Sequence, residues 1–155
     1  GYSDSPTAVV EVVKHQDKYY CRELVYSREL TNSDLVERLK GYNIKRNHIL
    51  YCDAAEPQRI TELQRAGFSA KKAEKAVLAG IDFVQSLHPD ILVHEDSGNL
   101  LQEADSYTWK KDKFGQSVDA PEKANDHLLD ALRYALFTHN YRNSEMTYRK
   151  LRAFY

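Results

Sequence analysis

Two carboxylates and an imidazole fall on adjacent turns of one stretch, residues 126–134. They belong to Asp126, His127 and Asp130, and Arg133 follows them. The apolar residues of this stretch repeat at about 100° per residue, which predicts an amphipathic helix with the four polar residues on its other side. Carboxylates held on a rigid element suit a hard divalent cation. The alternative is a solvated helix face with an acidic N-terminus and an Asp130–Arg133 ion pair, and this stretch by itself favours that alternative.

A further carboxylate, Asp53, directly follows the short apolar run at residues 48–52. A continuous apolar run is typical of a strand covered on both faces, and open α/β sheets bind ligands at the carboxyl ends of their strands. An Asp that opens a loop also commonly bonds nearby backbone, so both interpretations of Asp53 stay open. Carboxylates brought together repel one another unless a cation compensates them, and Asp53 and the helix residues could therefore share one metal centre.

Two groups of lysines could bind a phosphate backbone beside such a centre. One group lies beside the short strand predicted after Gly67, and the other lies with Trp109 on a predicted hairpin. Solvated lysines are the alternative, because acidic residues interrupt both groups. The candidate DNA-binding residues are Lys71, Lys72, Lys75, Lys110 and Lys111.

The elements that must position these residues alternate along the chain. β-branched residues predict a strand over residues 6–13 and a second strand over 18–30 that pairs back on it. A β-hairpin followed by helices and short strands predicts an α/β fold with a mixed sheet and helices on both faces. The remaining predicted elements are helices over about 34–41, 57–66, 75–87, 99–107 and 125–141, strands over 48–52, 68–73 and 91–93, and a hairpin over 107–118.

Composition limits the class of protein. A chain of 155 residues with 42% hydrophobic and 29% charged residues fits one ordinary globular domain with a real core. The net charge of −1 predicts no global attraction to a polyanion, so nucleic-acid binding would need local basic patches. Cys21 and Cys52 lack metal-knuckle spacing and are expected to be free thiols in a reducing compartment. No membrane-spanning run, signal-peptide pattern or serine nucleophile elbow is present. No Gly-rich phosphate loop is present either, which excludes an ATPase from these residues.

Five segments of the chain resemble the C-terminal nuclease domain of tailed-phage terminase large subunits, in the same order. The resemblance runs from Gly1 to about Leu136 and implies an RNase H-like fold, that of the ribonuclease H and retroviral integrase superfamily. The segments are GYSDSPTA at 1–8, YCDAAEP at 51–57, AGID at 79–82, YTWK at 107–110 and NDHLLDALRY at 125–134.

This resemblance implies a metal-dependent endonuclease that cuts concatemeric viral double-stranded DNA during packaging, in the cytoplasm of a bacterial host. Asp53 resembles the strand-end metal ligand, Asp130 the helix ligand, and His127 the histidine that assists them. Asp126 is a further candidate metal residue, behind those ligands. Two Mg²⁺ or Mn²⁺ ions in the complete domain would carry out phosphodiester hydrolysis. The implied partners are DNA, an ATPase domain of the same polypeptide, the portal and the small terminase subunit.

The chain departs from the family pattern in two places. The family's first metal Asp lies just before the segment that matches Gly1, on the central strand of the sheet. We therefore expect a piece of a longer polypeptide whose sheet has a gap or a borrowed strand, and which could be inactive without that Asp. Residues 71–77 also carry Ala and Val where a turn with Gly and Ser is expected, which weakens the prediction of DNA contacts there.

Residues 1–141 are expected to form the nuclease domain and residues 142–155 a basic, aromatic tail. Two alternatives to the packaging nuclease remain. A catalytically silent module could dock on the portal or on the motor ATPase domain through that tail. A junction-resolving or recombination nuclease of the same fold is the weaker alternative.

Overall fold

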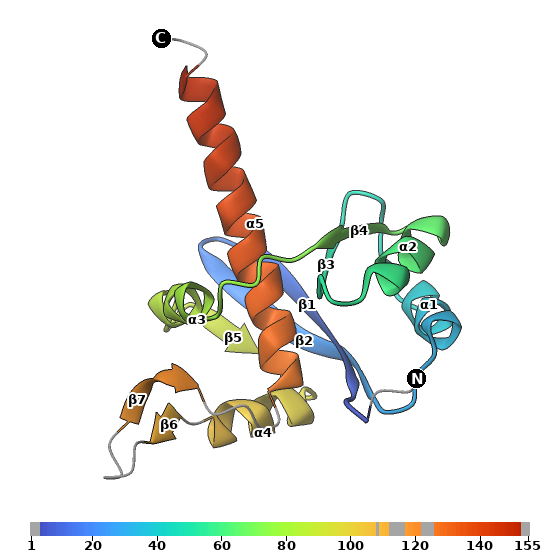
Figure 1. The fold of residues 1–155 in the computed structure, drawn as a ribbon, viewed down its shortest axis with the longest axis horizontal. Coiled ribbons are helices and arrows are strands. Elements are labelled where there is room, and N and C mark those ends of the chain that lie inside the picture. The colour runs from blue at the N-terminus through green and yellow to red at the C-terminus, as the bar shows by residue number, and fades with distance from the viewer. Residues whose placement is uncertain (1–3, 108, 112–116, 122–125, 153–155) are drawn as a thin grey trace.

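The computed structural model describes residues 4–107, 109–111, 117–121 and 126–152, and the side chains of 4–107 and 126–142 (Figure 1). The elements are β1 (Thr7–His15), β2 (Lys18–Ser27), α1 (Asn32–Lys40), β3 (Ile49–Cys52), α2 (Pro57–Arg65), β4 (Ser69–Lys72), α3 (Val77–Ser86), β5 (Ile91–Val93), α4 (Gly98–Ser106), β6 (Trp109–Lys111), β7 (Ser117–Pro121) and α5 (His127–Arg152). No helix in these ranges is long and apolar enough to cross a bilayer.

The first two strands form the predicted hairpin. β1 pairs antiparallel with β2 from Thr7 opposite Ser27 to His15 opposite Lys18. The turn residues Gln16 and Asp17 have φ values of 48° and 65°, the left-handed conformation that two-residue hairpin turns require. β5 adds to the other edge of β2 in parallel, so the strand order is β1-β2-β5.

The remaining parallel strands form a sheet of their own. β3 pairs with β4, with Cys52 opposite Lys72. Within the described ranges β1 and β3 each pair with one strand, and no strand ladder joins them. The predicted mixed α/β arrangement is confirmed.

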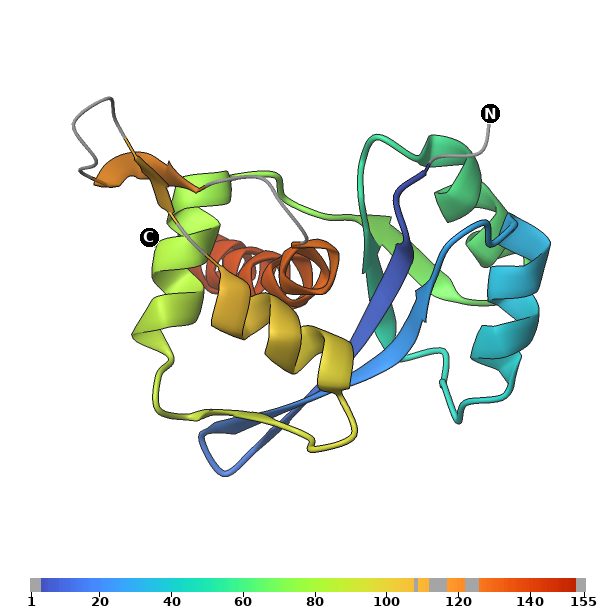
Figure 2. The same cartoon turned by 90° about the horizontal axis from the view of Figure 1, so that it is seen from below.

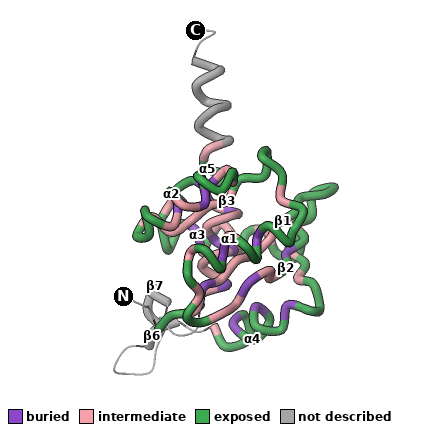
Figure 3. Tube along the Cα trace, turned by 90° about the vertical axis from the view of Figure 1, so that its right-hand side faces the viewer, coloured by how far each residue is buried: buried purple, intermediate pink, exposed green. Residues whose placement is uncertain are grey.

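Helices cover both faces of this divided sheet, as predicted (Figures 1 and 2). α5 contacts β1, β2 and β3 and packs against α3 and α4, while α1 and α2 pack together on the other side. Neighbouring residues of β1 separate the two faces, because Val9 packs with the α1–α2 side and Val10 with the α5 side. In Figure 3 the middle of the molecule holds buried and half-buried segments.

Two apolar clusters form the core. One joins β2 and β4 to α1 and α2, and thus connects the two sheets through side chains. The other joins β2 to α5. Burying each leucine stabilises the fold by roughly 1.5–3 kcal/mol. The clusters are Val25, Leu35, Leu39, Ile60, Leu63 and Ala70 on one side, and Cys21, Leu132 and Leu136 on the other.

Element boundaries follow local signals. Thr31 and Asp34 form a capping box at α1, and Pro57 occupies the start of α2. The second strand ends at Ser27 rather than near residue 30. α5 continues to Arg152, past the end expected near residue 141, because no Gly or Pro interrupts it. The turn of the β6–β7 hairpin and the side chains of the tail beyond residue 142 lie outside the described residues.

Candidate active site

Asp53 lies directly after β3, at its carboxyl end. Its Oδ1 accepts the Ala55 N–H at 2.9 Å and the Lys75 Nζ at 2.9 Å. Burial would raise the pKa of Asp53, but the hydrogen bond from Ala55 and the ammonium of Lys75 outweigh it and hold the pKa below its usual value. Asp53 therefore makes the loop-opening hydrogen bond that the sequence allowed, and the same carboxylate oxygen pairs with Lys75.

Asp130 lies in the first turns of α5 and is paired within its own helix. Its Oδ1 accepts Arg133 Nη2 at 2.8 Å. The predicted ion pair is present, but the helix face is not a solvated one, because the Arg133 side chain is only 7% exposed. Its guanidinium lies over the Tyr134 ring, 4.8 Å from the centroid.

A glycine of α3 makes room for Arg133. A Cβ at Gly80 would lie 2.8 Å from Cδ of Arg133 and 2.9 Å from its Cγ. Nη1 of Arg133 is buried without a hydrogen-bond partner in the described part of the chain. The stem of this arginine is thus held against the α3 backbone, which fixes the guanidinium beside Asp130.

Asp53 and Asp130 both affect the pKa of the Tyr134 phenol. Burial raises the pKa of Tyr134, the charges of Asp53 and Asp130 raise it further, and Arg133 and Lys75 oppose them. Arg133 also lowers the pKa of Asp53. Tyr134 follows Asp130 by one turn on α5, and α5 contacts β3. The fold therefore brings Asp53, Lys75, Asp130 and Arg133 together around Tyr134, a group called the charged cluster below.

His127 and Asp126 lie at the start of α5 and are half-buried. The backbone N–H groups that follow them are capped by Glu103, which the sequence analysis did not predict as a capping residue. Glu103 Oε2 accepts the N–H groups of Leu128 at 2.8 Å and Leu129 at 3.0 Å. Glu103 is 4% exposed. The one available signal was its spacing from Leu100, which places an acidic residue on the buried face of α4.

Electrostatics link this cap to the same end of α5. Burial raises the pKa of Glu103, the two capping N–H groups and His127 lower it, and Asp126 raises it, with a net increase. Glu103 therefore carries an unfavourable buried charge that the helix N-terminus only partly compensates.

The donor type at the charged cluster suits a hard divalent cation, but the number of donors is small. Nowhere in the described ranges are three His, Cys, Asp or Glu side chains arranged to hold a metal ion. The bonds described for Asp53 and for Asp130 all end on Oδ1. Two carboxylates with an oxygen each to contribute fit part of a magnesium or manganese site.

The candidate DNA-binding lysines divide into three cases. Lys71 and Lys72 are exposed on β4, next to β3. Lys75 is bound to Asp53. Lys110 and Lys111 belong to β6, and their side chains are outside the described residues. The Lys72 carbonyl also accepts Arg142 Nη2 at 2.8 Å, which ties α5 to β4.

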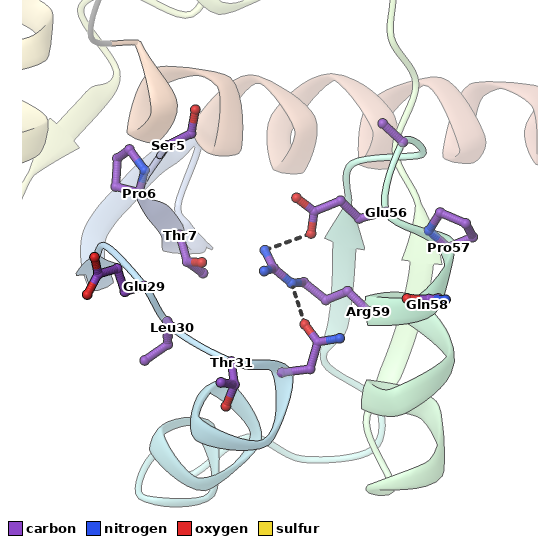
Figure 4. A pocket seen from close by; sticks show the side chains of 12 residues that line it. Ser5, Pro6, Thr7, Glu29, Leu30, Thr31, Glu56, Pro57, Gln58 and Arg59 are labelled. Carbon is purple, nitrogen blue, oxygen red and sulfur yellow. Dashed lines mark hydrogen bonds and ion pairs between the residues drawn. The ribbon is translucent and has the colours of Figure 1, made fainter. Parts of the chain in front are cut away.

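A pocket of about 620 Å³ lies between the β2–α1 loop and the start of α2 (Figure 4). Its lining reaches Ala55 and Glu56 but includes neither Asp53 nor Asp130. The guanidinium of Arg59 is bonded to Glu56 at 2.8 Å and to Asn32 at 3.0 Å. The pocket therefore offers no uncommitted guanidinium for an anionic ligand.

Comparison with known proteins identifies the family. The family described as the terminase RNAseH like domain matches residues 1–137. The chain belongs to this family. This terminase domain is 25% identical over 140 residues to the PBSX phage terminase large subunit of Bacillus subtilis (strain 168), covering 88% of this chain and 32% of that protein. It is 29% identical over 151 residues to the terminase large subunit of Escherichia phage T5, covering 89% and 33%. The chain thus spans about a third of the length of these curated relatives.

Solved terminase structures share the fold. The g2p large terminase nuclease domain of bacteriophage SPP1, solved with bound Mn, matches with a TM-score of 0.74 and 20% identity, over 90% of this chain and 82% of that one. The large terminase of a thermophilic bacteriophage matches with a TM-score of 0.71 and 24% identity, over 86% and 36%. The terminase domain therefore has the RNase H-like fold that the resemblance predicted.

Proposed function

We propose that this terminase domain is a metal-dependent endonuclease that cuts double-stranded viral DNA during packaging. The family and the fold support a DNA-packaging nuclease. The observation that carries the proposal is the charged cluster, in which a carboxylate at the end of β3 and one on α5 lie within electrostatic reach of the same tyrosine. Carboxylates that converge from separate elements repel one another, and a divalent cation stabilises such an arrangement.

Asp53 and Asp130 are the proposed metal ligands, with His127 and Asp126 assisting from the first turn of α5. Bound Mg²⁺ or Mn²⁺, as two ions in the complete domain, would activate a water and stabilise the leaving oxygen of the phosphodiester. Since two carboxylates do not fill such a site, water and phosphate oxygens are proposed to complete it. The Mn bound to the SPP1 nuclease domain supports a divalent metal.

Exposed lysines beside Asp53 are proposed to position the DNA. Lys72 lies opposite Cys52 in the β3–β4 register, and Lys71 precedes it. Contacts from such lysines to phosphates carry no base information, so cleavage is expected to be weakly sequence-specific. Because the curated relatives are large subunits about three times as long, the proposed context is a polypeptide with an ATPase domain. The proposed partners also include the portal and the small terminase subunit, and the proposed location is the bacterial cytoplasm.

Asp130→Asn tests the function. The change keeps the size of the side chain and removes its charge, so Mn²⁺-dependent nicking of plasmid DNA by the natural polypeptide should fall to background. Asp105→Asn is the matched control, since Asp105 is an exposed carboxylate on α4. Nicking by Asp130→Asn at the unmodified rate would remove Asp130 from the site. A variant that nicks DNA at background level and still binds Mn²⁺ as tightly as the unmodified protein would contradict its role as a ligand.

A further inference from the structure

The charged cluster is electrically balanced by the chain's own side chains. Asp53 is bonded to Lys75 and Asp130 to Arg133, so two negative groups face two positive groups around Tyr134. A divalent cation that enters this cluster adds two positive charges beside two cations already present. Like charges a few ångströms apart repel, so binding is favoured when one of the resident cations leaves.

The two resident cations differ in how firmly they are held. Arg133 is 7% exposed, its stem rests on Gly80, and its guanidinium lies over Tyr134. Moving it would expose this packing and leave a buried cavity. The Lys75 side chain is 53% exposed, and the contact described for its ammonium is the one to Asp53.

Its position on the chain also allows Lys75 to move. It lies in the connection between β4 and α3, in neither a strand nor a helix. Exposed ion pairs contribute roughly 0–1 kcal/mol, which a metal–carboxylate bond readily exceeds. Its ammonium can therefore turn into solvent at little cost, whereas the guanidinium of Arg133 cannot.

We propose that Lys75 is the resident counter-cation of Asp53: it holds this carboxylate in the metal-free protein and is displaced when a divalent cation binds. The inference rests on the proposed function, because it assigns the metal to Asp53. It also gives Lys75 a role other than the static DNA contact expected from the sequence. The buried Arg133 stays on Oδ1 of Asp130 throughout, and the metal takes the other oxygen.

Manganese affinity tests this proposal without relying on activity. Isothermal titration of Mn²⁺ into the natural polypeptide, without nucleotide, gives the affinity, and Asp53→Asn identifies the heat that belongs to this site. Lys75→Gln removes the competing charge and should bind Mn²⁺ roughly threefold to tenfold more tightly. Lys75→Arg keeps the charge and should bind like the unmodified protein.

The matched control is Lys40→Gln. Lys40 is 54% exposed and pairs with Glu37 at 2.8 Å, so it resembles Lys75 in exposure and pairing but lies on α1. This variant should leave the affinity unchanged. Equal or weaker Mn²⁺ binding by Lys75→Gln, with binding by the unmodified protein intact, would overturn the inference alone. Absence of Mn²⁺ binding by the unmodified protein and every variant would overturn both the inference and the proposed metal site.

Discussion

At the scale of single residues, Gly80 has a defined task. The stem of Arg133 occupies the space that a Cβ would need, at 2.8 Å from its Cδ. Gly80→Ala should lower the free energy of unfolding by about 1–3 kcal/mol through overpacking. This loss is expected although alanine favours a helix by roughly 1 kcal/mol over glycine. Urea unfolding followed by circular dichroism measures it.

Gly98 provides the comparison for that substitution. It begins α4, and a Cβ there would meet no atom within 4 Å. Gly98→Ala should therefore leave stability unchanged or raise it slightly. If Gly80→Ala unfolds at the same urea concentration as Gly98→Ala, the Arg133 stem moves freely and is not held by α3.

The sequence predicts the elements that carry the candidate site residues better than it predicts the partners of those residues. Asp53 and Asp130 could be assigned to a strand end and a helix because the local apolar pattern determines both elements. The Asp53–Lys75 pair joins two separate loops, and the burial of Arg133 depends on α3 crossing α5 at Gly80. Neither follows from spacing, since both depend on tertiary packing between elements.

At the scale of elements, α4 determines the start of α5 through Glu103. Glu103→Ala removes the acceptor for two backbone N–H groups and should cost about 1–2 kcal/mol, as loss of a helix cap does. Glu103→Gln keeps an acceptor oxygen and should cost much less. It also removes the buried charge, so the pH dependence of stability should change.

The sign of that pH dependence follows from the raised pKa of Glu103. Between the unfolded and the folded pKa the native state binds the extra proton, so stability falls as pH rises through this window. Glu103→Gln should flatten the fall, which thermal unfolding from pH 4 to pH 7 would measure. An unchanged slope in Glu103→Gln would mean that other groups cause it.

Elements themselves were mostly predicted from the chain. Helices and strands appear where capping residues, Pro57 and apolar periodicity indicated them. The Glu103 cap was missed because a helix start reveals only its local capping candidates, while Glu103 comes from the preceding helix. The length of α5 was underestimated because a basic sequence without Gly or Pro carries no signal for a helix end.

At the scale of the whole molecule, the two sheets are joined by side chains. Within the described ranges β1 has a strand partner on one edge, β2. In an antiparallel pair alternate residues direct their N–H groups to the partner and away from it. Hydrogen exchange of the 155-residue chain should therefore alternate along β1 between protected and rapidly exchanging amides. Uniform protection along β1 would mean that its second edge is also paired.

Among the contacts that fasten α5, Glu103 bonds it at Leu128 and Arg142 bonds it to the Lys72 carbonyl. The fourteen residue steps from Leu128 to Arg142 rise about 1.5 Å each, so these attachments are spaced roughly 21 Å apart along the helix. Adding or deleting a single residue between them would rotate one attachment by about 100° relative to the other. Natural length variation in this helix should therefore be confined to the part beyond Arg142, because the two attachments fix the length of the span before it.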